Sequence, residues 1–366
     1  MPQKMHDTAQ KAKRALLVSL NKDASRELQG LAETLGLNIV SNEIINIREK
    51  QPKFGMGSGK ASELTEKAKE LEADCIVFDF DLSPSQQRNW EDLAGFPVLD
   101  RQELIIQIFA SRAITREADL QVQLAQLHYR LPRLTHKYID LSQQRGGRYG
   151  SKGKGETKLE TDRRRIEQQI HKLEKEIEQV SKQRQVQRSQ RQRQGLPVCA
   201  IVGYTNAGKS SLLNALTGAA VFVEDKLFAT LDATTRRLQL EDGKTVLLTD
   251  TVGFIRRLPH SLIKAFRSTL EEASHADLIL HVLDASDSNI DEYYQTTITV
   301  LSELGAGEIP VITVLNKIDK LEDASQTENL LSRFPDSAAI SVKEKIGLDK
   351  LKNYITTGLR IGVVTH

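Results

Sequence analysis

Apolar and polar positions change their pattern along this chain of 366 residues. Over residues 1–112, short apolar runs at Ala15–Leu20 and Asp74–Phe80 alternate with helix-like stretches at Ser25–Leu35 and Ser62–Leu71. Strand-like runs that alternate with amphipathic helices are typical of a sheet covered by helices. We therefore expect a small α/β domain at residues 1–112.

A longer period follows in residues 113–195. Apolar residues recur there mostly at steps of four and three, first from Leu120 to Leu134 and again from Leu159 to Val180. This spacing places them on one stripe of a helix, and Pro132 can bend the end of the first helix. Two such helices joined by a loop bury their stripes against each other. The pattern predicts a long antiparallel helical hairpin, which we call the arm.

The tip of the arm is basic and rich in glycine. The loop predicted at Gln143–Gly155 contains Arg145, Arg148, Tyr149, Lys152 and Lys154, and the charge continues with Arg163, Arg164 and Arg165. Residues 145–193 hold fifteen Lys and Arg against seven Asp and Glu, while the whole chain has a net charge of only +2. Basic side chains bind phosphates and an aromatic ring stacks on unpaired bases, so these residues are expected to contact RNA. The alternative is a flexible linker between solvated helices.

Residues 196–366 return to alternating strands and helices. The predicted strands are the apolar runs at residues 198–202, 244–249, 276–285, 309–315 and 338–341. Because helix-like segments separate these runs, a mostly parallel sheet with helices on its faces is expected.

The first of these strands leads into a phosphate-binding loop. Its residues are Gly203, Tyr204, Thr205, Asn206, Ala207, Gly208, Lys209 and Ser210. The glycines let successive backbone N–H groups point at phosphate oxygens, and the following helix adds the positive end of its dipole. Lys209 can reach the β- and γ-phosphates, and the Ser210 hydroxyl completes the shell of a Mg²⁺ ion. The alternative is a plain glycine-containing turn between strand and helix.

Three further motifs stand at strand ends. The first is Asp250, Thr251, Val252 and Gly253; the second is Asn316, Lys317, Ile318 and Asp319; the third is Ser341, Val342 and Lys343. Asp250 can hold Mg²⁺ through water, and the Gly253 N–H can contact a γ-phosphate. The Asp319 carboxylate can accept the N1–H and exocyclic amine of guanine, a donor pair that adenine lacks. Asn316 and Lys317 can brace the ring and loop, and the third motif can donate an N–H to the guanine oxygen.

These motifs select GTP over ATP, with GDP as the product and Mg²⁺ as cofactor. The predicted fold is α/β: a Ras-like P-loop GTPase domain at residues 196–366, preceded by the small α/β domain and the arm.

The motifs GYTNAGKS, FATLDATTRR, DTVGFIRRLP, NKID and SVK follow an α/β segment and a helical hairpin with a Gly/Arg-rich tip. In this order, from about Arg14 to about Leu359, the chain resembles the HflX GTPases, which belong with Obg in the translation-factor class. The resemblance implies that Phe228, Ala229, Thr230, Leu231 and Asp232 form the first switch, with Thr230 as a Mg²⁺ ligand beside Ser210. The residues alone leave Thr230, Thr234 and Thr235 as equal candidates.

Phe254 follows Gly253 at the position where many GTPases have a glutamine that orients the attacking water. A phenyl ring can neither donate to this water nor accept from it, so GTP hydrolysis should be slow without a partner. HflX-like proteins have an apolar residue here, and the resemblance implies binding to the large ribosomal subunit and its rRNA, in ribosome splitting or rescue. We take Lys209, Thr230 and Gly253 as catalytic. Arg256 or Arg257 can supply charge in the transition state, the alternative being solvent-facing arginines.

Composition narrows the remaining possibilities. No apolar run approaches the ~20 residues that cross a bilayer, and the N-terminal apolar run is too short for a secretory signal. We therefore expect a cytoplasmic protein without a membrane span, monomeric when bound to its partner. Cys75 and Cys199 lie in apolar runs and are expected to be reduced core thiols. Asp79 and Asp81 are expected in a loop and a helix cap rather than at a metal.

One glycine-rich turn leaves alternatives open. Gly55–Lys60 precedes a helix and can be a flexible turn or an anion cradle. An RNA-remodelling NTPase with a second ATP site at this turn is therefore one rival function. The others are a nucleotide-gated RNA-binding module with little turnover and a metabolic phosphotransferase.

Overall fold

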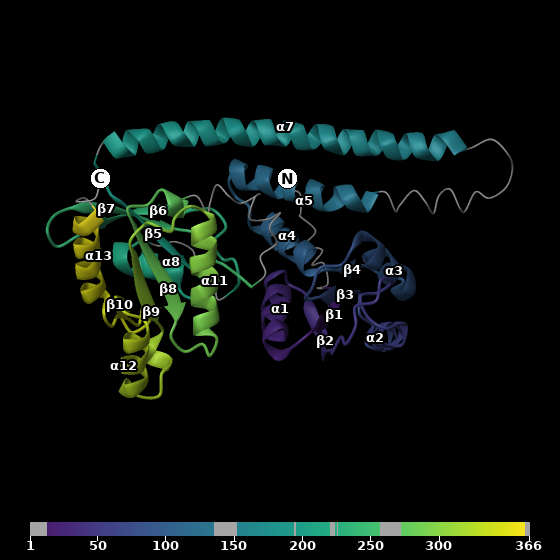
Figure 1. Ribbon diagram of the computed structural model, residues 1–366, viewed down its shortest axis with the longest axis horizontal. Helices are drawn as coiled ribbons and strands as arrows, with labels where there is room; N and C mark the ends of the chain where they lie inside the picture. Colours follow the sequence, from purple (N-terminus) through teal and green to yellow (C-terminus); the bar gives the residue numbers. More distant parts are fainter. Residues whose placement is uncertain are drawn as a thin grey trace, which may run out of the picture. The chain divides into compact units, whose positions relative to one another are not determined.

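The computed structural model describes residues 13–134, 152–193, 195–219, 224, 226–256 and 272–362. The chain divides into two compact units: one combines residues 1–111 with 126–168, and the other combines 112–125 with 169–366. The division passes through the helices α5 (Arg116–Arg130) and α7 (Lys152–Arg193), which contribute to both units. Figure 1 labels the elements of each unit.

A four-stranded parallel sheet forms the centre of the first unit, in the order β2-β1-β3-β4. Its strands are β1 (Arg14–Ser19), β2 (Asn38–Ile44), β3 (Cys75–Phe78) and β4 (Val98–Leu99). Its helices are α1 (Lys22–Thr34), α2 (Ser58–Glu70), α3 (Pro84–Ala94) and α4 (Arg101–Arg112). The inner strands β1 and β3 are almost wholly buried, as expected for a parallel sheet with helices on its faces.

The glycine-rich turn before α2 is packed into this unit. Phe54 and Met56 are buried, and the indole N–H of Trp90 donates to the Phe54 carbonyl oxygen at 3.0 Å. Trp90 also packs on Phe78, with 4.8 Å between the ring centroids. Lys60 forms an ion pair with Glu63 at 2.7 Å. The turn therefore has a structural role, because its apolar residues are part of the core of the first unit.

Asp79 lies in the loop that joins β3 to α3. Its carboxylate forms an ion pair with buried Arg101 at 2.5 Å, while Ser83 caps α3 through the Gln86 N–H at 3.2 Å. The stretch therefore is the expected loop and helix cap, and the ion pair with Arg101, 22 residues away in the sequence, is a contact that the sequence did not indicate.

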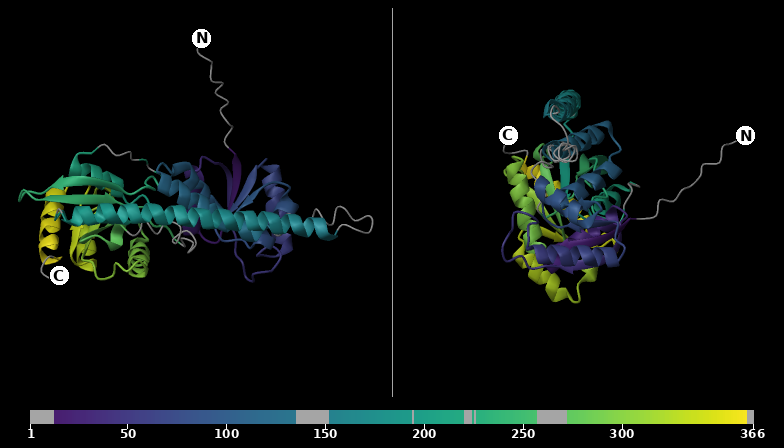
Figure 2. Two further views of the ribbon diagram at one scale, coloured as in Figure 1. Left: turned by 90° about the horizontal axis from the view of Figure 1, so that it is seen from above. Right: turned by 90° about the vertical axis from the view of Figure 1, so that its right-hand side faces the viewer.

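The second helix of the arm is longer than the leucine spacing predicts. After α5, Pro132 lies in a 3₁₀ turn, η1 (Leu131–Arg133), so the regular α-helix ends before the proline that was expected to bend its end. Helix α7 has 42 residues, and Figure 2 shows it as one continuous helix. Lys152 and Lys154 therefore lie in a helix and not in the predicted tip loop, because a long helix tolerates the glycines at 153 and 155. Residues 135–151, including Arg145, Arg148 and Tyr149, lie outside the described residues.

Within the second unit, the start of α5 lies against the C-terminal half of α7. Arg116 pairs with Glu176 at 3.4 Å, and Glu117 pairs with Arg184. Figure 1 shows that the two helices run in opposite directions, as predicted. The predicted stripe is only partly buried, however, because Ala118, Val122 and Ala125 form the more buried face of α5.

The second unit contains a six-stranded sheet in the order β10-β9-β8-β5-β7-β6. The strands are β5 (Val198–Gly203), β6 (Thr234–Gln239), β7 (Thr245–Asp250), β8 (Leu278–Asp284), β9 (Val311–Asn316) and β10 (Ser337–Ala339). The helical elements are α8 (Lys209–Thr217), α11 (Ile290–Glu303), η2 (Ile318–Lys320), α12 (Ala324–Arg333) and α13 (Leu348–Gly362). Among the strands that the structure describes, only β6 and β7 pair antiparallel in this sheet, so the mostly parallel prediction is confirmed.

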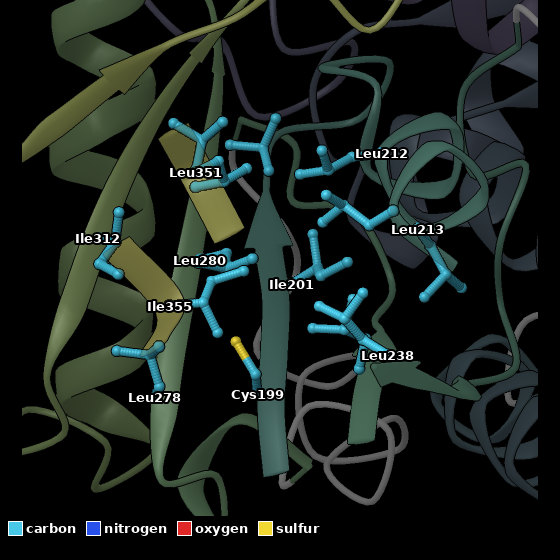
Figure 3. Close-up of a cluster of buried hydrophobic side chains, with 14 of the residues drawn as sticks. Cys199, Ile201, Leu212, Leu213, Leu238, Leu278, Leu280, Ile312, Leu351 and Ile355 are labelled. Carbon is cyan, nitrogen blue, oxygen red and sulfur yellow. The ribbon is translucent and has the colours of Figure 1, made fainter. Parts of the chain in front are cut away.

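The central strand β5 is anchored by an apolar core. Figure 3 shows Cys199 and Ile201 of β5 among the side chains of Leu212, Leu280 and Ile355. These residues come from α8, β8 and α13, and all of them are fully buried. The core fixes the C-terminal end of β5, from which the phosphate-binding loop starts. Both cysteines are free and buried, and burial raises the pKa of the Cys75 thiol to about 11.

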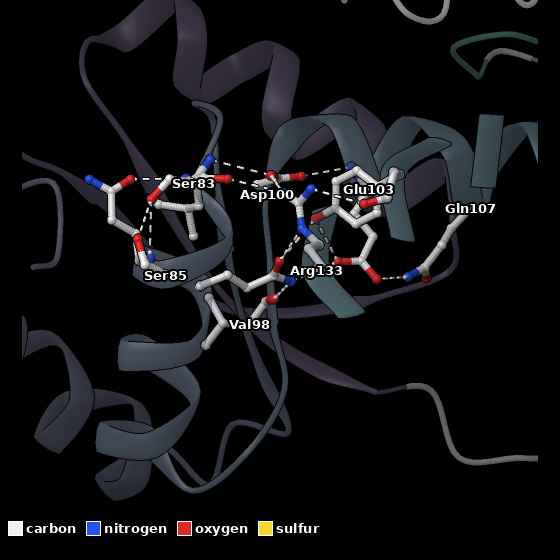
Figure 4. Close-up of polar contacts among 11 residues, drawn as sticks. Ser83, Ser85, Val98, Asp100, Glu103, Gln107 and Arg133 are labelled. Atoms are coloured by element: carbon white, nitrogen blue, oxygen red, sulfur yellow. Dashed lines mark hydrogen bonds and ion pairs between the residues drawn. The ribbon is translucent and has the colours of Figure 1, made fainter. Parts of the chain in front are cut away.

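A buried polar cluster completes the first unit (Figure 4). Arg133 of η1 donates to Gln87 at 2.7 Å, to the Leu82 carbonyl oxygen at 2.9 Å and to Asp100 at 3.0 Å. Its guanidinium also lies 3.5 Å from the centre of the Tyr129 ring. Burial raises the pKa of Asp100 to about 6, although Arg133 opposes this shift. Every helix described is too short or too polar to cross a membrane.

Candidate nucleotide-binding site

The predicted motifs meet at one edge of the second unit's sheet. The parallel strands β5, β7 and β9 end at Gly203, Asp250 and Asn316, and each motif begins at such an end. The carboxyl ends of parallel strands are where α/β proteins bind ligands. The sequence predicts that the motifs meet here, because their position at the ends of parallel strands follows from the pattern of strands and helices alone.

The two loop glycines are required by close packing. A Cβ at Gly203 would lie 2.2 Å from the Val282 carbonyl oxygen, and one at Gly208 would lie 2.4 Å from Asn316 Nδ2. Both residues also have positive φ, +146° and +96°. Helix α8 begins directly after Gly208, so its free N–H groups face the end of the sheet, as an anion site requires.

Lys209 is held in place by the loop itself. Its Nζ donates to the Tyr204 carbonyl oxygen at 2.8 Å, and the side chain is buried. Burial lowers the pKa of Lys209 to about 8, although the nearby Asp250 carboxylate opposes this shift. A polyphosphate at this site would stabilise the charged lysine, because opposite charges favour ionisation.

Ser210, Thr230 and Asp250 form what we call the hydroxyl–carboxylate cluster. Ser210 Oγ lies 2.7 Å from Thr230 Oγ1 and 2.6 Å from Asp250 Oδ2, and Thr230 Oγ1 donates to the same oxygen at 3.0 Å. Asp250 is completely buried, and burial raises the pKa of its carboxyl group. Its Oδ1 has no hydrogen-bond partner among the described residues. Buried oxygens with spare acceptor capacity fit a hard cation such as Mg²⁺.

The cluster distinguishes Thr230 from the two other threonines that the residues alone left open. Thr234 donates to the Asp232 carbonyl oxygen at 3.4 Å, and Thr235 bonds to Thr249 at 3.0 Å. Phe228 and Leu231 are buried, whereas Ala229 and Asp232 are half-buried. Phe228 has a positive φ of 54°, a conformation that costs about 1 kcal/mol for a residue with a Cβ.

The segment after β7 pairs with the phosphate-binding loop. Thr205 N–H donates to the Phe254 carbonyl oxygen at 2.8 Å, and Phe254 N–H donates to the Gly203 carbonyl oxygen at 3.1 Å. Thr251 and Val252 are buried before it, and Thr251 donates to the Ile201 carbonyl oxygen. The Phe254 side chain is only 1% exposed. It therefore presents no polar group to a bound nucleotide.

The motifs predicted to recognise the base are hydrogen-bonded to the same loop. Asn316 Nδ2 donates to the Ala207 carbonyl oxygen at 2.9 Å, and its Oδ1 accepts from the Val342 N–H at 3.2 Å. Lys317 Nζ donates to the Asn206 carbonyl oxygen at 2.8 Å. Ile318 is half-buried, while Lys343 is exposed.

Asp319 is exposed and oriented by Ser341, whose hydroxyl donates to Asp319 Oδ1 at 2.5 Å. This hydrogen bond holds the pKa of Asp319 below its usual value. The carboxylate is thus ionised and ready to accept two hydrogen bonds.

Sequence reasoning missed several residues of this site. Asp284, at the end of β8, pairs with Lys317 at 2.7 Å, and its place at a strand end was the available signal. Tyr204 stacks on Tyr293 of α11, with 3.8 Å between the centroids, and no local pattern announces this contact. Glu224 and Lys226 line a cavity of ≈ 50 Å³ together with the phosphate-binding loop and the first switch.

The two arginines proposed for transition-state charge have different outcomes. Arg256 forms an ion pair with Glu292 at 2.5 Å, and its N–H donates to the Tyr204 hydroxyl at 2.6 Å. Its guanidinium is thus engaged by α11. Arg257 lies outside the described residues.

Among the predicted RNA-contacting residues, Arg163, Arg164 and Arg165 are exposed on α7. Arg163 pairs with Glu167 at 2.9 Å, and Arg165 lies 3.7 Å from Asp162. Such exposed ion pairs are weak and exchange readily for other anions.

Three family models match successive parts of this chain. The model described as GTP-binding GTPase N-terminal matches residues 22–110, and that described as GTP-binding GTPase Middle Region matches residues 112–191. The model described as 50S ribosome-binding GTPase matches residues 198–317. The matches thus extend beyond the nucleotide-binding motifs.

Individual proteins are similar over most of the chain. GTPase HflX of Akkermansia muciniphila is 46% identical over 360 residues, covering 93% of this chain and 82% of that protein. GTPase HflX of Escherichia coli strain K12 is 41% identical over 369 residues, covering 99% and 86%. A solved GTP-binding protein from Sulfolobus solfataricus, in complex with GDP, is 26% identical with a TM-score of 0.51, covering 95% of this chain and 99% of that one.

Proposed function

Because this chain belongs to the HflX family of GTPases, we propose that it binds the large ribosomal subunit and hydrolyses GTP there, in ribosome splitting or rescue. Family membership establishes GTP and GDP binding and GTP hydrolysis; the ribosomal role is the proposal. The observation that supports it best is Phe254. The edge of the sheet carries all the predicted phosphate- and guanine-binding motifs, and the buried phenyl ring of Phe254 lies next to them. The site therefore binds GTP but lacks a glutamine that could orient the attacking water.

Each motif has a defined task in the proposed reaction. The N–H groups of Gly203–Ser210 bind the phosphates, and Lys209 neutralises charge on the β- and γ-phosphates. Asp319 accepts two hydrogen bonds from guanine, while Asn316 keeps the base-recognition loop attached to the phosphate-binding loop. Gly253 N–H binds the γ-phosphate.

The hydroxyl–carboxylate cluster is suited to Mg²⁺. We assign Ser210 and Thr230 as its side-chain ligands, with Asp250 accepting from a water of the ion. When bound, the ion neutralises charge on the β- and γ-phosphate oxygens. Thr230 can then remain near the γ-phosphate only while this phosphate is present, which makes the first switch sensitive to hydrolysis.

The basic helix α7 supports the choice of a ribosomal partner. Its exposed arginines at 163–165 can exchange their carboxylate partners for RNA phosphates. The family model described as 50S ribosome-binding GTPase is consistent with this partner. We further propose three functional parts: an α/β domain at 1–112, the arm at 113–195 and the GTPase domain at 196–366.

Phosphate release from GTP, measured with and without purified large ribosomal subunits, tests the proposal. We expect subunits to raise turnover by at least tenfold, equivalent to about 1.4 kcal/mol of barrier. Replacing Arg163, Arg164 and Arg165 together by Ala should abolish most of this stimulation and leave turnover without subunits unchanged. It should also reduce the salt dependence of subunit binding, by about one unit of slope for each lost phosphate contact.

A matched control removes the same charge elsewhere on the helix. Lys172, Lys175 and Lys182 are exposed on α7, so their joint replacement by Ala lowers the charge equally. This control should keep full stimulation. Turnover that stays unchanged with subunits would contradict the proposal and favour a nucleotide-gated RNA-binding module.

A further inference from the structure

The first switch segment (Phe228–Asp232) is hydrogen-bonded to the start of α5. The Asp232 carboxylate accepts the N–H groups of Ile114 and Thr115, each at 3.2 Å, and also the Thr115 hydroxyl. All these residues belong to the second unit. The Asp232 side chain of the GTPase domain thus accepts hydrogen bonds from backbone N–H groups just before α5, the first helix of the arm.

Thr115 is also the residue that caps α5. Its hydroxyl oxygen accepts the Ala118 N–H at 3.2 Å, and its carbonyl oxygen accepts the Asp119 N–H at 3.0 Å. The oxygen of an N-cap hydroxyl accepts a hydrogen bond from its own helix, and its O–H group can still donate to another acceptor. Here the Thr115 O–H donates to the Asp232 carboxylate, so one hydroxyl group links α5 to the first switch segment.

A second contact supports the same connection. Arg112 pairs with Glu224 at 2.5 Å, and Glu224 lines the cavity beside Lys209. Residues 112–115, from the last residue of α4 to the residue before α5, therefore bind the chain both before Phe228, at Glu224, and after it, at Asp232. A cavity of ≈ 210 Å³, lined by Thr115, Asp232 and Arg184 among others, borders these bonds. The connection is polar and loosely packed, so it can open without breaking an apolar core.

The chain links this contact to the hydroxyl–carboxylate cluster. Asp232 follows Thr230 by two residues, and two residues span at most about 7 Å. Thr230 lies 2.7 Å from Ser210 while Asp232 is bonded to Thr115. A movement of Thr230 by several Å therefore pulls on the Asp232 bonds.

We propose that Thr115 is a positioning residue for GTP hydrolysis, which holds Thr230 at the metal site through Asp232 and makes the start of α5 respond to the γ-phosphate. The inference rests on the role assigned above to Thr230. Such coupling is reciprocal: if GTP strengthens the Asp232–Thr115 contact, the contact strengthens GTP binding by the same factor. GDP, which has no γ-phosphate, gains little from it.

Affinities of a non-hydrolysable GTP analogue and of GDP, measured without ribosomal subunits, test this inference. We expect Thr115→Ala to weaken analogue binding by about tenfold, the effect of ~1.4 kcal/mol, and to leave GDP binding within about twofold. Thr115→Ser keeps the hydroxyl and should restore wild-type values. Asn21→Ala removes the cap of α1, in the other unit, and should change neither affinity.

Two further measurements separate positioning from a general loss of structure. In a double-mutant cycle, Thr115→Ala should cause no additional loss of analogue affinity once Asp232 is replaced by Ala. In hydrogen exchange, the N–H groups of Ile114 and Thr115 should be better protected with the analogue than with GDP. Additive losses, or equal protection in both states, would overturn the inference.

Thr230→Ala distinguishes this inference from the role on which it rests. If Thr230→Ala lowers analogue affinity and Thr115→Ala does not, the positioning role of Thr115 is wrong and the assignment of Thr230 stands. If neither change has an effect, both are wrong.

Discussion

Replacing Gly253 by Ala should uncouple the segment after β7 from the phosphate-binding loop. A Cβ there would lie 2.8 Å from Lys209 Nζ, 2.8 Å from Thr205 Cγ2 and 2.9 Å from Thr205 Cα. The contact with Thr205 Cα is a backbone contact, so a change of side-chain rotamer cannot relieve it. To reach a normal carbon–carbon distance of about 3.5 Å, the two backbones must separate by roughly 0.6 Å.

This separation has a cost for stability and a larger one for hydrolysis. The hydrogen bonds between Phe254 and residues 203 and 205, at 3.1 and 2.8 Å, would weaken or break, which costs up to about 2 kcal/mol of unfolding free energy. A displacement of ~1 Å at a reacting centre can lower a rate by about a hundredfold. We therefore expect GTP hydrolysis to fall by ten- to a hundredfold, about 1.4 to 2.7 kcal/mol of barrier.

Single-turnover phosphate release at saturating GTP measures this effect, with chemical denaturation as the measure of folding. Gly243→Ala is the control for packing, because a Cβ at Gly243 meets nothing within 4 Å, although Gly243, unlike Gly253, has a positive φ of +81°. This control should lose about 1 kcal/mol of stability through backbone strain and keep its hydrolysis rate. A folded Gly253→Ala protein with hydrolysis within about twofold of the wild type would refute the packing argument.

Three other outcomes follow from buried or oriented charges. Burial, with a contribution from Lys209, lowers the His281 pKa from 6.5 to about 3. Below pH 6.5 the unfolded chain therefore binds a proton at His281 that the folded chain does not bind. The free energy of unfolding should be roughly 2 kcal/mol lower at pH 5 than above pH 6.5. His281→Leu should remove this pH dependence in urea unfolding. Arg133→Ala leaves the buried Asp100 carboxylate without its ion-pair partner and should cost about 3 kcal/mol, whereas Arg133→Lys, measured by the same denaturation, should cost less. Asp319→Asn replaces an acceptor by a donor beside guanine and should weaken GTP binding by at least about tenfold in a calorimetric titration, with no change in stability.

Local patterns predicted much of the fold and most of the residues that the fold brings together at the candidate site. The strands that carry the motifs are short apolar runs with helices between them, and this alternation requires no tertiary information. Strand β6 was missed because it is an exposed edge strand, with Arg236 and Arg237 exposed on it. The start of α7 was missed because Gly153 and Gly155 are typical of a loop, although 42 residues of helix absorb their cost.

The unpredicted part of the site consists of long-range pairs. Asp284 reaches Lys317 because β8 and β9 are neighbours, and Asp232 reaches Thr115 across 117 residues of sequence. Neither residue stands in a periodic pattern that points to its partner. Motif spacing identifies the candidate nucleotide-binding residues, whereas only the folded chain reveals what holds those residues in position.

The side chain of Asn316 makes nucleotide preference a joint property of three loops. Its amide bonds to Ala207 on one side and Val342 on the other, at 2.9 and 3.2 Å. A change at Asp319 alone would therefore alter the proposed base contact, while these two bonds would still hold the three loops in place. In evolutionary terms, a new base specificity would need coordinated substitutions in all three loops. The preference for GTP should thus persist through many single mutations elsewhere in the chain.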